Sequence, residues 1–370
     1  MAAKDISSIL THFNKETMGN KGKAKISLYS EIDHKVDVIP TGIEAVDKAT
    51  SIGGLPRGRI AEIYGPESGG KSWISMKVGG SAQRIGLRVA MVDVEHTFDP
   101  VWGKTSAGLD ADASSFLYGS DFDSGEDALQ HVIGLCNDKV ADVIIVDSTA
   151  ALIPKAELEA NLEDAQMGKM GQMMSRAIRQ ISDACAKSNT LVIFVNQVRD
   201  KVGVMFGNPE TTPGGRALKF YSSMRLRVAR QGKPGMGTSD DGEEVPAYIE
   251  SKLQVIKNKV GRPFGEATFR IDFATSTDPY VLLVQKACDL GLLRRRTDED
   301  DKKVFVWGKG KTAEMTGAEY IPQMAEWITS SVKVKELIEM IKVAAKEKGV
   351  VIDPAMLDLP EKTEIEPTST

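Results

Sequence analysis

The stretch that decides the fold of this chain is Gly65-Pro66-Glu67-Ser68-Gly69-Gly70-Lys71-Ser72. It fits the complete pattern G-x-x-x-x-G-K-[ST], and it lies between the apolar run 59–64 and a segment with helical character. In this context the glycines let backbone N–H groups point at a triphosphate, Lys71 reaches the β and γ phosphates, and the Ser72 hydroxyl completes a Mg²⁺ shell. The alternative, a glycine-rich turn that matches by composition, does not explain the flanking strand and helix. All eight residues are therefore predicted to bind nucleotide.

Length and composition are those of a globular protein with one core and smaller appendages. The chain has 370 residues, of which 41% are hydrophobic and 27% charged, and its net charge is −5. No apolar run reaches the ~18 to 20 residues of a membrane span, and the N-terminus shows no secretory signal, so we expect no membrane association and a cytoplasmic location. The mild acidity does not favour nucleic acid as a partner, although it leaves room for a local basic channel.

Cysteine and histidine usage indicates neither disulfides nor a zinc site. Cys136, Cys185 and Cys288 are far apart in sequence, odd in number and form no C-x-x-C pair. We interpret them as reduced packing residues. The four histidines show no spacing typical of zinc ligands.

Residues 36–272 alternate strand-like apolar runs with amphipathic helical segments, which is typical of an α/β protein. The expected strands are 59–64, 88–94, 141–146, 191–195, 223–228 and 251–257. Consecutive apolar positions, as in 143–146, indicate a parallel sheet with helices on both faces. The segment 266–271 alternates instead and should extend the sheet in antiparallel fashion. We therefore predict a P-loop ATPase core with a mostly parallel central sheet flanked by helices.

Four regions are expected along the chain. Residues 1–35 form a one-sided helix, with Ile6, Ile9, Leu10 and Phe13 at helical spacing, and a polar linker. This helix packs either on its own core or on a neighbouring subunit, since short isolated helices are marginal in water. Residues 36–273 form the core, and 274–332 a small α+β domain with a hairpin joining 292–297 to 303–307. Residues 333–370 form a lysine-rich helix and an acidic, disordered tail.

Three polar residues follow predicted strands, where a parallel sheet places ligand-binding groups. Asp147 ends the strand 143–146 and would hold Mg²⁺ through water or Ser72. Glu95 closes the strand after the loop's helix and would orient and deprotonate an attacking water, unless it only caps a helix or forms a surface ion pair. Gln197 would bind a γ phosphate and act as a switch, unless it is a satisfied amide at the start of a loop.

Two loops have the composition of a binding surface for single-stranded nucleic acid. Residues 198–215 show little secondary-structure pattern, which is unusual for a segment of that length inside a core, and residues 157–169 form a second charged, glycine-containing loop. Basic Arg199 and Lys201 suit phosphates, while Met167, Met205 and Phe206 suit insertion between bases. Composition alone does not separate this function from that of an ordinary surface loop.

The combined motifs resemble those of the RecA recombinases over about residues 36–273. They are residues 54–60 with 65–72, then 93–96, 146–148, 196–197 and the highly specific string 203–215. The resemblance implies a RecA-type core that binds ATP and Mg²⁺, forms a helical homo-oligomeric filament on single-stranded DNA, pairs it with homologous double-stranded DNA and exchanges strands. Departures at Ser72, Gln172 and Gln254, and a divergent C-terminal part, suit a divergent bacterial or phage member and weaken the case for the second DNA site.

The resemblance also implies functions for single residues. Glu95 is the catalytic carboxylate, Gln197 the ATP sensor, and Asp99 and Trp102 belong to the nucleotide site, with Trp102 on the adenine. Lys257 and Lys259, which in isolation suggest only a solvated strand end, reach the ATP of the adjacent subunit. The N-terminal helix becomes a polymerisation arm, and Phe220 an interface aromatic. The implied DNA-binding residues are Met167, Lys169, Arg176, Arg199, Lys201, Val204, Met205, Phe206, Asn208, Thr211, Gly214 and Gly215.

Other function classes share parts of this pattern. A ring helicase has the same core but lacks the string 205–210. A filament that only protects DNA or serves as a signalling platform would use ATP as a switch, and a small-molecule kinase would need an acceptor pocket and an arginine-rich lid that the sequence does not show. Repressor or loading proteins as further partners are left open by these residues.

Overall fold

The computed structural model describes residues 6–18, 36–161, 168–200, 210–238, 244–273, 283, 287, 292–297, 303–307, 311–314 and 331–348. The chain divides into two compact units, Met1–Asp37 and Val38–Thr370. The first unit contains the predicted N-terminal helix, α1 (Ile6–Met18). Ile6 and Ile9 on its apolar side are 57% and 49% exposed. This helix therefore presents apolar surface that its own unit does not bury.

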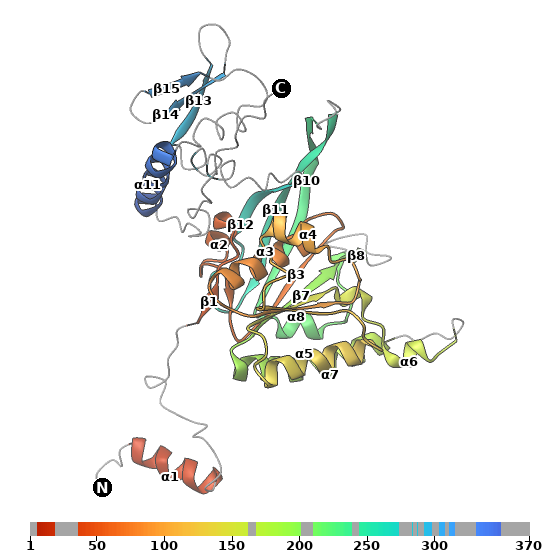
Figure 1. The fold of residues 1–370 in the computed structure, drawn as a ribbon. Helices are drawn as coiled ribbons and strands as arrows, with labels where there is room; N and C mark the ends of the chain where they lie inside the picture. The colour runs from red at the N-terminus through yellow and green to blue at the C-terminus, as the bar shows by residue number, and fades with distance from the viewer. Residues whose placement is uncertain are drawn as a thin grey trace. The chain divides into compact units, whose positions relative to one another are not determined.

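The second unit is built on an eight-stranded sheet with the order β12-β11-β10-β3-β7-β6-β4-β5 (Figure 1). All neighbours from β10 to β5 pair in parallel, while β11 and β12 are antiparallel. The predicted mostly parallel sheet with an antiparallel extension is confirmed. The strands are β3 (Ile60–Gly65), β4 (Val89–Asp93), β5 (Phe116–Gly119), β6 (Val143–Asp147), β7 (Leu191–Gln197), β10 (Met224–Thr238), β11 (Glu244–Asn258) and β12 (Glu266–Asp272).

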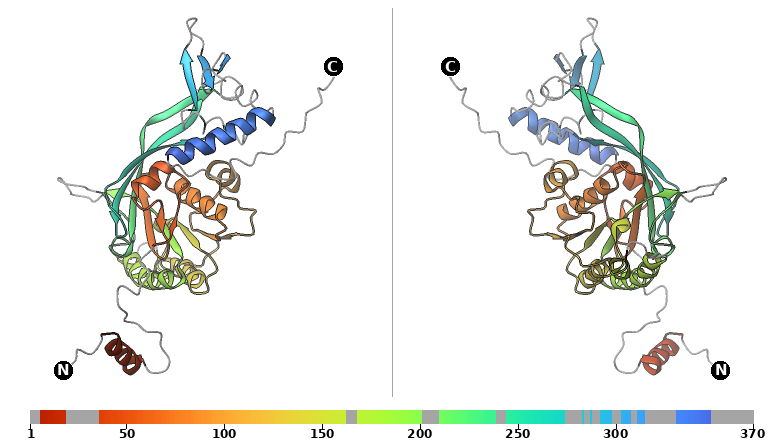
Figure 2. Two further views of the ribbon diagram at one scale, coloured as in Figure 1. Left: turned by 90° about the vertical axis from the view of Figure 1, so that its left-hand side faces the viewer. Right: turned by 90° about the vertical axis from the view of Figure 1, so that its right-hand side faces the viewer.

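Helices cover both faces of this sheet, and each face has its own core (Figures 1 and 2). One core packs the strands against α3 (Lys71–Arg84), the other against α5 (Gly125–Asn137) and α7 (Lys169–Ser188). In β6, Val143 and Ile145 enter the first core, whereas Ile144 and Val146 enter the second. Because side chains alternate along a strand, only a continuous apolar run can serve two cores.

Shorter elements connect the layers. They are β1 (Val38–Ile39), α2 (Glu44–Ala49), β2 (Leu55–Pro56), α4 (Pro100–Trp102), the π turn η3 (Gly103–Ala107), the 3₁₀ turn η4 (Thr149–Ala151), α6 (Lys155–Leu158), β8 (Arg199–Asp200), β9 (Glu210–Thr211) and α8 (Ala217–Tyr221). The pairing of β8 with β9 closes the base of the loop predicted at 198–215.

The C-terminal part contains the predicted hairpin and one more strand. β13 (Leu293–Thr297), β14 (Lys303–Trp307) and β15 (Lys311–Glu314) form an antiparallel sheet. The lysine-rich helix α11 (Ser331–Lys348) begins at Ser331 rather than Lys333. The predicted acidic tail lies outside the described residues.

Strands β10 and β11 extend well beyond the predicted segments 223–228 and 251–257. Glycines at 232 and 235 are typical of a break in a strand. The ring of Tyr248 nevertheless covers Gly235, where an added Cβ would lie 2.0 Å from that ring. The guanidinium of Arg270 lies over the same ring, 3.6 Å from its centroid. A cross-strand aromatic ring thus supplies packing that glycine lacks.

Cys136 and Cys185 are buried and free, as predicted, while Cys288 lies outside the described residues. Over the described ranges, no helix combines the length and the apolar character needed to cross a membrane.

Candidate functional site

The glycine-rich loop 65–72 turns between β3 and α3, and its glycines are required by the fold. An added Cβ at Gly65 would lie 1.9 Å from the carbonyl oxygen of Val228. Gly70 has φ +91°, and its Cβ would meet the Cδ1 atom of Ile271 at 2.3 Å. The Ser251 hydroxyl donates to the Gly69 carbonyl at 3.0 Å. Strands β10, β11 and β12 therefore fix the loop that follows β3.

Lys71, the first residue of α3, folds back over this loop. Its Nζ atom donates to the Pro66 carbonyl at 2.7 Å. Burial lowers the pKa of Lys71, while the charges of Asp147, Glu95 and Glu67 oppose this shift. The ammonium group is thus centred in the loop and faces carboxylates that come from β4 and β6.

Asp147 ends β6 next to Ser72, and this pair suits a divalent cation. Asp147 is 2% exposed and forms a hydrogen bond with the Ser72 side chain. Burial raises the pKa of Asp147 to about 6; the Ser72 hydrogen bond opposes this shift, and Glu95 adds to it. Among the described residues no group of three acidic, histidine or cysteine side chains forms a cage for a metal ion. A hydroxyl and one carboxylate suit Mg²⁺, which binds with few protein ligands and completes its shell with waters and phosphate oxygens.

Glu95 and Gln197 meet at the same edge of the sheet. The Gln197 Nε2 atom donates to Glu95 Oε1 at 3.1 Å. Ser148, directly after Asp147, also donates its hydroxyl to Glu95. No role for Ser148 was predicted from the motif 146–148, although its position after a strand-ending aspartate could have indicated one.

A buried polar network links Gln197 to the loop behind it. The Asn196 side chain donates to Glu62 Oε1 at 3.1 Å and to the Pro213 carbonyl at 3.3 Å. Glu62 is fully buried and forms an ion pair with Arg225, whose guanidinium lies over the Tyr64 ring at 4.4 Å. This network was not predicted from the sequence, although the acidic Glu62 inside the apolar run 59–64 could have indicated it.

The predicted loop 198–215 is anchored at both ends. Arg199 is exposed and pairs with Thr211 across β8 and β9, and the Arg227 Nε atom donates to Glu210 Oε2 at 2.8 Å. The predicted DNA-binding residues Lys201, Val204, Met205, Phe206 and Asn208 lie outside the described residues, as does Met167 of the predicted loop 157–169.

The two loops approach each other at the start of α7. A Cβ added at Gly214 would lie 3.3 Å from Met174 Cγ, and one at Gly215 would lie 3.4 Å from the Cα of Gly171. Lys169 and Arg176 are exposed on the same helix and line a groove of about 620 Å³ between α5 and α7. Exposed cations therefore lie beside the ends of both loops.

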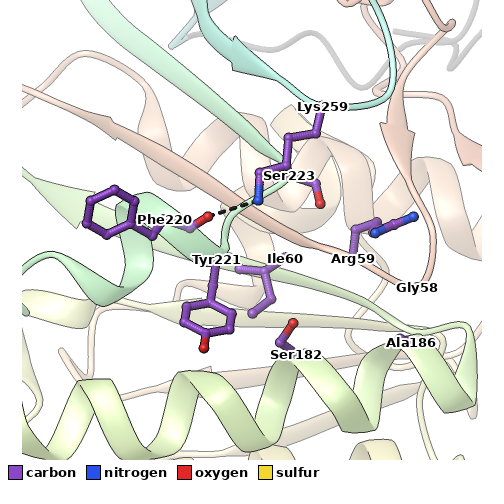
Figure 3. Close-up of a pocket in the computed structure, with 9 residues that line it drawn as sticks. All are labelled: Gly58, Arg59, Ile60, Ser182, Ala186, Phe220, Tyr221, Ser223 and Lys259. Atoms are coloured by element: carbon purple, nitrogen blue, oxygen red, sulfur yellow. Dashed lines mark hydrogen bonds between the residues drawn. The ribbon is translucent and has the colours of Figure 1, made fainter.

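Lys257 and Lys259 converge on the carbonyl end of the short helix α8. Lys257 Nζ donates to the carbonyls of Lys219 and Phe220 at 2.6 and 3.0 Å, and Lys259 Nζ donates to Phe220 at 3.0 Å. Figure 3 shows Lys259 beside Phe220 and Tyr221 at a cavity of about 290 Å³. Burial, followed by the charges of Lys259 and Arg225, lowers the pKa of Lys257 to about 8.

These two lysines lie at the opposite edge of the sheet from the glycine-rich loop. Lys257 is opposite Arg225, which pairs with Glu62, the third of the six residues of β3, whereas the loop follows Gly65 at the end of β3. At about 3.3 Å per residue, the three steps from Glu62 to Gly65 separate Lys257 from the start of the loop by roughly 10 Å along the strand. The lysines are therefore badly placed to reach a phosphate on their own loop.

Asp99 and Trp102 form a separate small turn. The Asp99 carboxylate caps α4 by accepting hydrogen bonds from the N–H groups of Val101 and Trp102 at 2.8 and 3.0 Å. Trp102 is partly buried against the α3 side of the core. Their predicted contacts with nucleotide stay predictions.

A glycine-rich loop between the first strand of the parallel core and its helix, with carboxylates from adjacent strands facing it, defines a P-loop nucleotide-binding α/β protein. The family model for the RecA N-terminal domain matches residues 4–278. The chain therefore belongs to the RecA family, as the resemblance implied, and is a recombinase of homologous recombination and repair.

Close relatives support this assignment along most of the chain. Protein RecA of Thermus aquaticus is 43% identical over 332 residues, covering 88% of this chain and 93% of that protein. Protein RecA of Symbiobacterium thermophilum is 50% identical over 236 residues, or 64% and 65% of the two chains.

A crystal structure of the RadB recombinase matches with a TM-score of 0.47 and 21% identity, covering 63% of this chain and 96% of that one.

Proposed function

We propose that this recombinase is a DNA-dependent ATPase that forms ATP-dependent filaments on single-stranded DNA in the cytoplasm and catalyses homologous pairing and strand exchange. The observation that carries the proposal is the contact between Glu95 and Gln197 beside Lys71 and Asp147. It supports an arrangement in which Glu95 would be the base, Gln197 an amide switch, Lys71 a phosphate ligand and Asp147 a metal ligand at one edge of the sheet.

Residues 65–72 would hold the phosphates of ATP, and Ser72 with Asp147 would hold Mg²⁺. A bound Mg²⁺ would neutralise phosphate charge during transfer. Glu95 orients a water and accepts its proton, which is general-base catalysis. Gln197 donates to Glu95 in the present structure. Donation to a γ phosphate instead would free the carboxylate to accept the water's hydrogen bond.

The same movement of Gln197 would be felt at the DNA loop. Its neighbour Asn196 is hydrogen-bonded to the Pro213 carbonyl, one residue before Gly214. Cations at Lys169, Arg176 and Arg199 would contact DNA phosphates, and the bases would meet residues of the two loops. Nucleotide state and DNA binding are thus coupled through β7.

ATP would bind between two copies of the chain. Lys257 and Lys259 lie at the sheet edge away from their own glycine-rich loop, so they suit the γ phosphate of an adjacent subunit. The exposed apolar side of α1 and the 66% exposed Phe220 provide further surface for contact between subunits. A helical filament provides both the ATP site between two copies and the additional contacts between subunits.

The test compares wild type with Glu95→Gln in ATPase assays with and without single-stranded DNA, alongside strand exchange. Wild type should hydrolyse ATP slowly alone and much faster with DNA. The isosteric variant should bind DNA in the presence of ATP but lose turnover by about 100-fold or more. Unchanged turnover would remove Glu95 from its proposed role, and closed rings in electron micrographs of the ATP–DNA complex would indicate a helicase instead.

A further inference from the structure

Asp93, the last residue of β4, is a buried carboxylate with only one of its oxygens in use. Its side chain is fully buried. The Oδ2 atom accepts from the Phe98 N–H at 2.9 Å and from the Tyr118 hydroxyl at 3.0 Å. The Oδ1 atom accepts no hydrogen bond from any residue that the structure describes. Because an unpaired buried polar atom is costly, this oxygen calls for a partner beyond the residues that the structure describes.

The register of the sheet places Asp93 directly beside Asp147. The two residues are paired across the parallel strands β4 and β6. Val89 and Val143, which are also paired and lie an even number of positions earlier, belong to the core on the α3 side. Side chains of even spacing share a face, so both carboxylates point toward α3, whose first turn carries Ser72.

We propose that Asp93 is a further positioning residue of the metal site, whose Oδ1 accepts a hydrogen bond from a water ligand of the divalent cation. This inference rests on the proposed nucleotide function. Mg²⁺ keeps several waters when it is bound by one carboxylate and phosphate oxygens, and these waters need acceptors. Asp93 Oδ1 is a buried acceptor on the face that carries Ser72 and Asp147.

Phe98 and Tyr118 determine which oxygen of Asp93 is available. Both donate to Oδ2, which leaves Oδ1 for the site. In an Asp93→Asn variant the Phe98 N–H still needs an acceptor, so the amide oxygen takes the Oδ2 position and the NH₂ group takes the Oδ1 position. A donor would then face the hydrogens of the metal-bound water. The substitution preserves shape, so its effect should be electrostatic rather than a failure to fold.

The experiment titrates Mn²⁺ into the full chain saturated with ATPγS and follows free Mn²⁺ by electron paramagnetic resonance. Wild type, Asp93→Asn and the matched control Asp112→Asn are compared. The control makes the same change where the side chain is 89% exposed. Loss of an outer-sphere partner should raise the Mn²⁺ dissociation constant about 10- to 100-fold in Asp93→Asn. The control should stay within about twofold of wild type.

The outcomes separate this inference from the proposed function. If wild type itself shows no nucleotide-dependent Mn²⁺ site, the proposed function fails and takes the inference with it. If wild type binds Mn²⁺ and Asp93→Asn binds it equally well, the inference alone fails. Should circular dichroism show that Asp93→Asn is unfolded, Tyr118→Phe decides, because it loosens Asp93 without removing its charge. That variant should bind Mn²⁺ about threefold more weakly, and an unchanged constant would overturn the inference.

Discussion

The lowered pKa of Lys257 makes the proposed activity sensitive to alkaline pH. Burial and two neighbouring cations bring this pKa from 10.5 to about 8. A lysine with a lowered pKa is cationic below that pH and neutral above it, so about 90% of the side chains are charged at pH 7 and about 10% at pH 9. If only the ammonium form assists phosphoryl transfer, kcat/KM should fall about tenfold for each pH unit above 8.

Lys257→Arg tests this reasoning because arginine keeps its charge throughout that range. We expect the variant to start with lower activity, since the geometry changes, but to lose the fall above pH 8. Lys259→Arg is the matched control, which keeps the lysine at 257 and therefore keeps the fall. The assay is DNA-stimulated ATP hydrolysis at subsaturating ATP between pH 6.5 and 9.5. Parallel profiles for wild type and Lys257→Arg would refute a titrating cation at this position.

Two further predictions concern the glycine-rich loop and its metal site. Gly70→Ala should destabilise the protein by about 1 to 2 kcal/mol, because alanine is strained at φ +91°, and weaken nucleotide binding. Gly134→Ala, in α5 with open space around it, should be neutral or stabilising when both are compared by urea denaturation. Asp147 has a raised pKa of about 6, so its ionisation in the folded protein lowers the free energy of unfolding. This loss is absent below the pKa of the unfolded state and complete above pH 6. Asp147→Asn should therefore stabilise the metal-free protein by about 3 kcal/mol at pH 7.5 and by about half that at pH 5, and equal gains at both values would contradict this cause.

The elements predicted correctly from sequence are those whose signal is local. The loop 65–72 is a continuous string, and the run 143–146 requires two cores because it offers no polar side to solvent. The strand-ending positions of Asp147 and Gln197 follow from the same runs. A parallel sheet then places such residues at one edge whatever the length of the connections.

What the sequence could not provide is the choice of partner for buried polar groups. Ser148, Asn196 and Asp93 fall within the sequence motifs, but no role could be predicted for them, because it arises from contacts with Glu95, Glu62 and Tyr118 in other parts of the chain. Such pairs depend on strand order, which no local pattern encodes. The extra length of β10 and β11 was missed for the same reason, since Tyr248 stabilises Gly235 only across the hairpin.

Strand order also explains why two lysines at a strand end are more than solvated charges. The antiparallel return of β11 along β10 brings Lys257 level with Glu62, three residues before Gly65 and the glycine-rich loop. The lowered pKa of Lys257 shows that its charge is held there at an energetic cost. Burial and the charge of Lys259 disfavour the ammonium form, and hydrogen bonds to two carbonyl groups offset this only in part. We therefore propose that a cation kept at such a cost, beside the exposed Phe220, meets an anion delivered by a second subunit rather than serving the stability of the single chain.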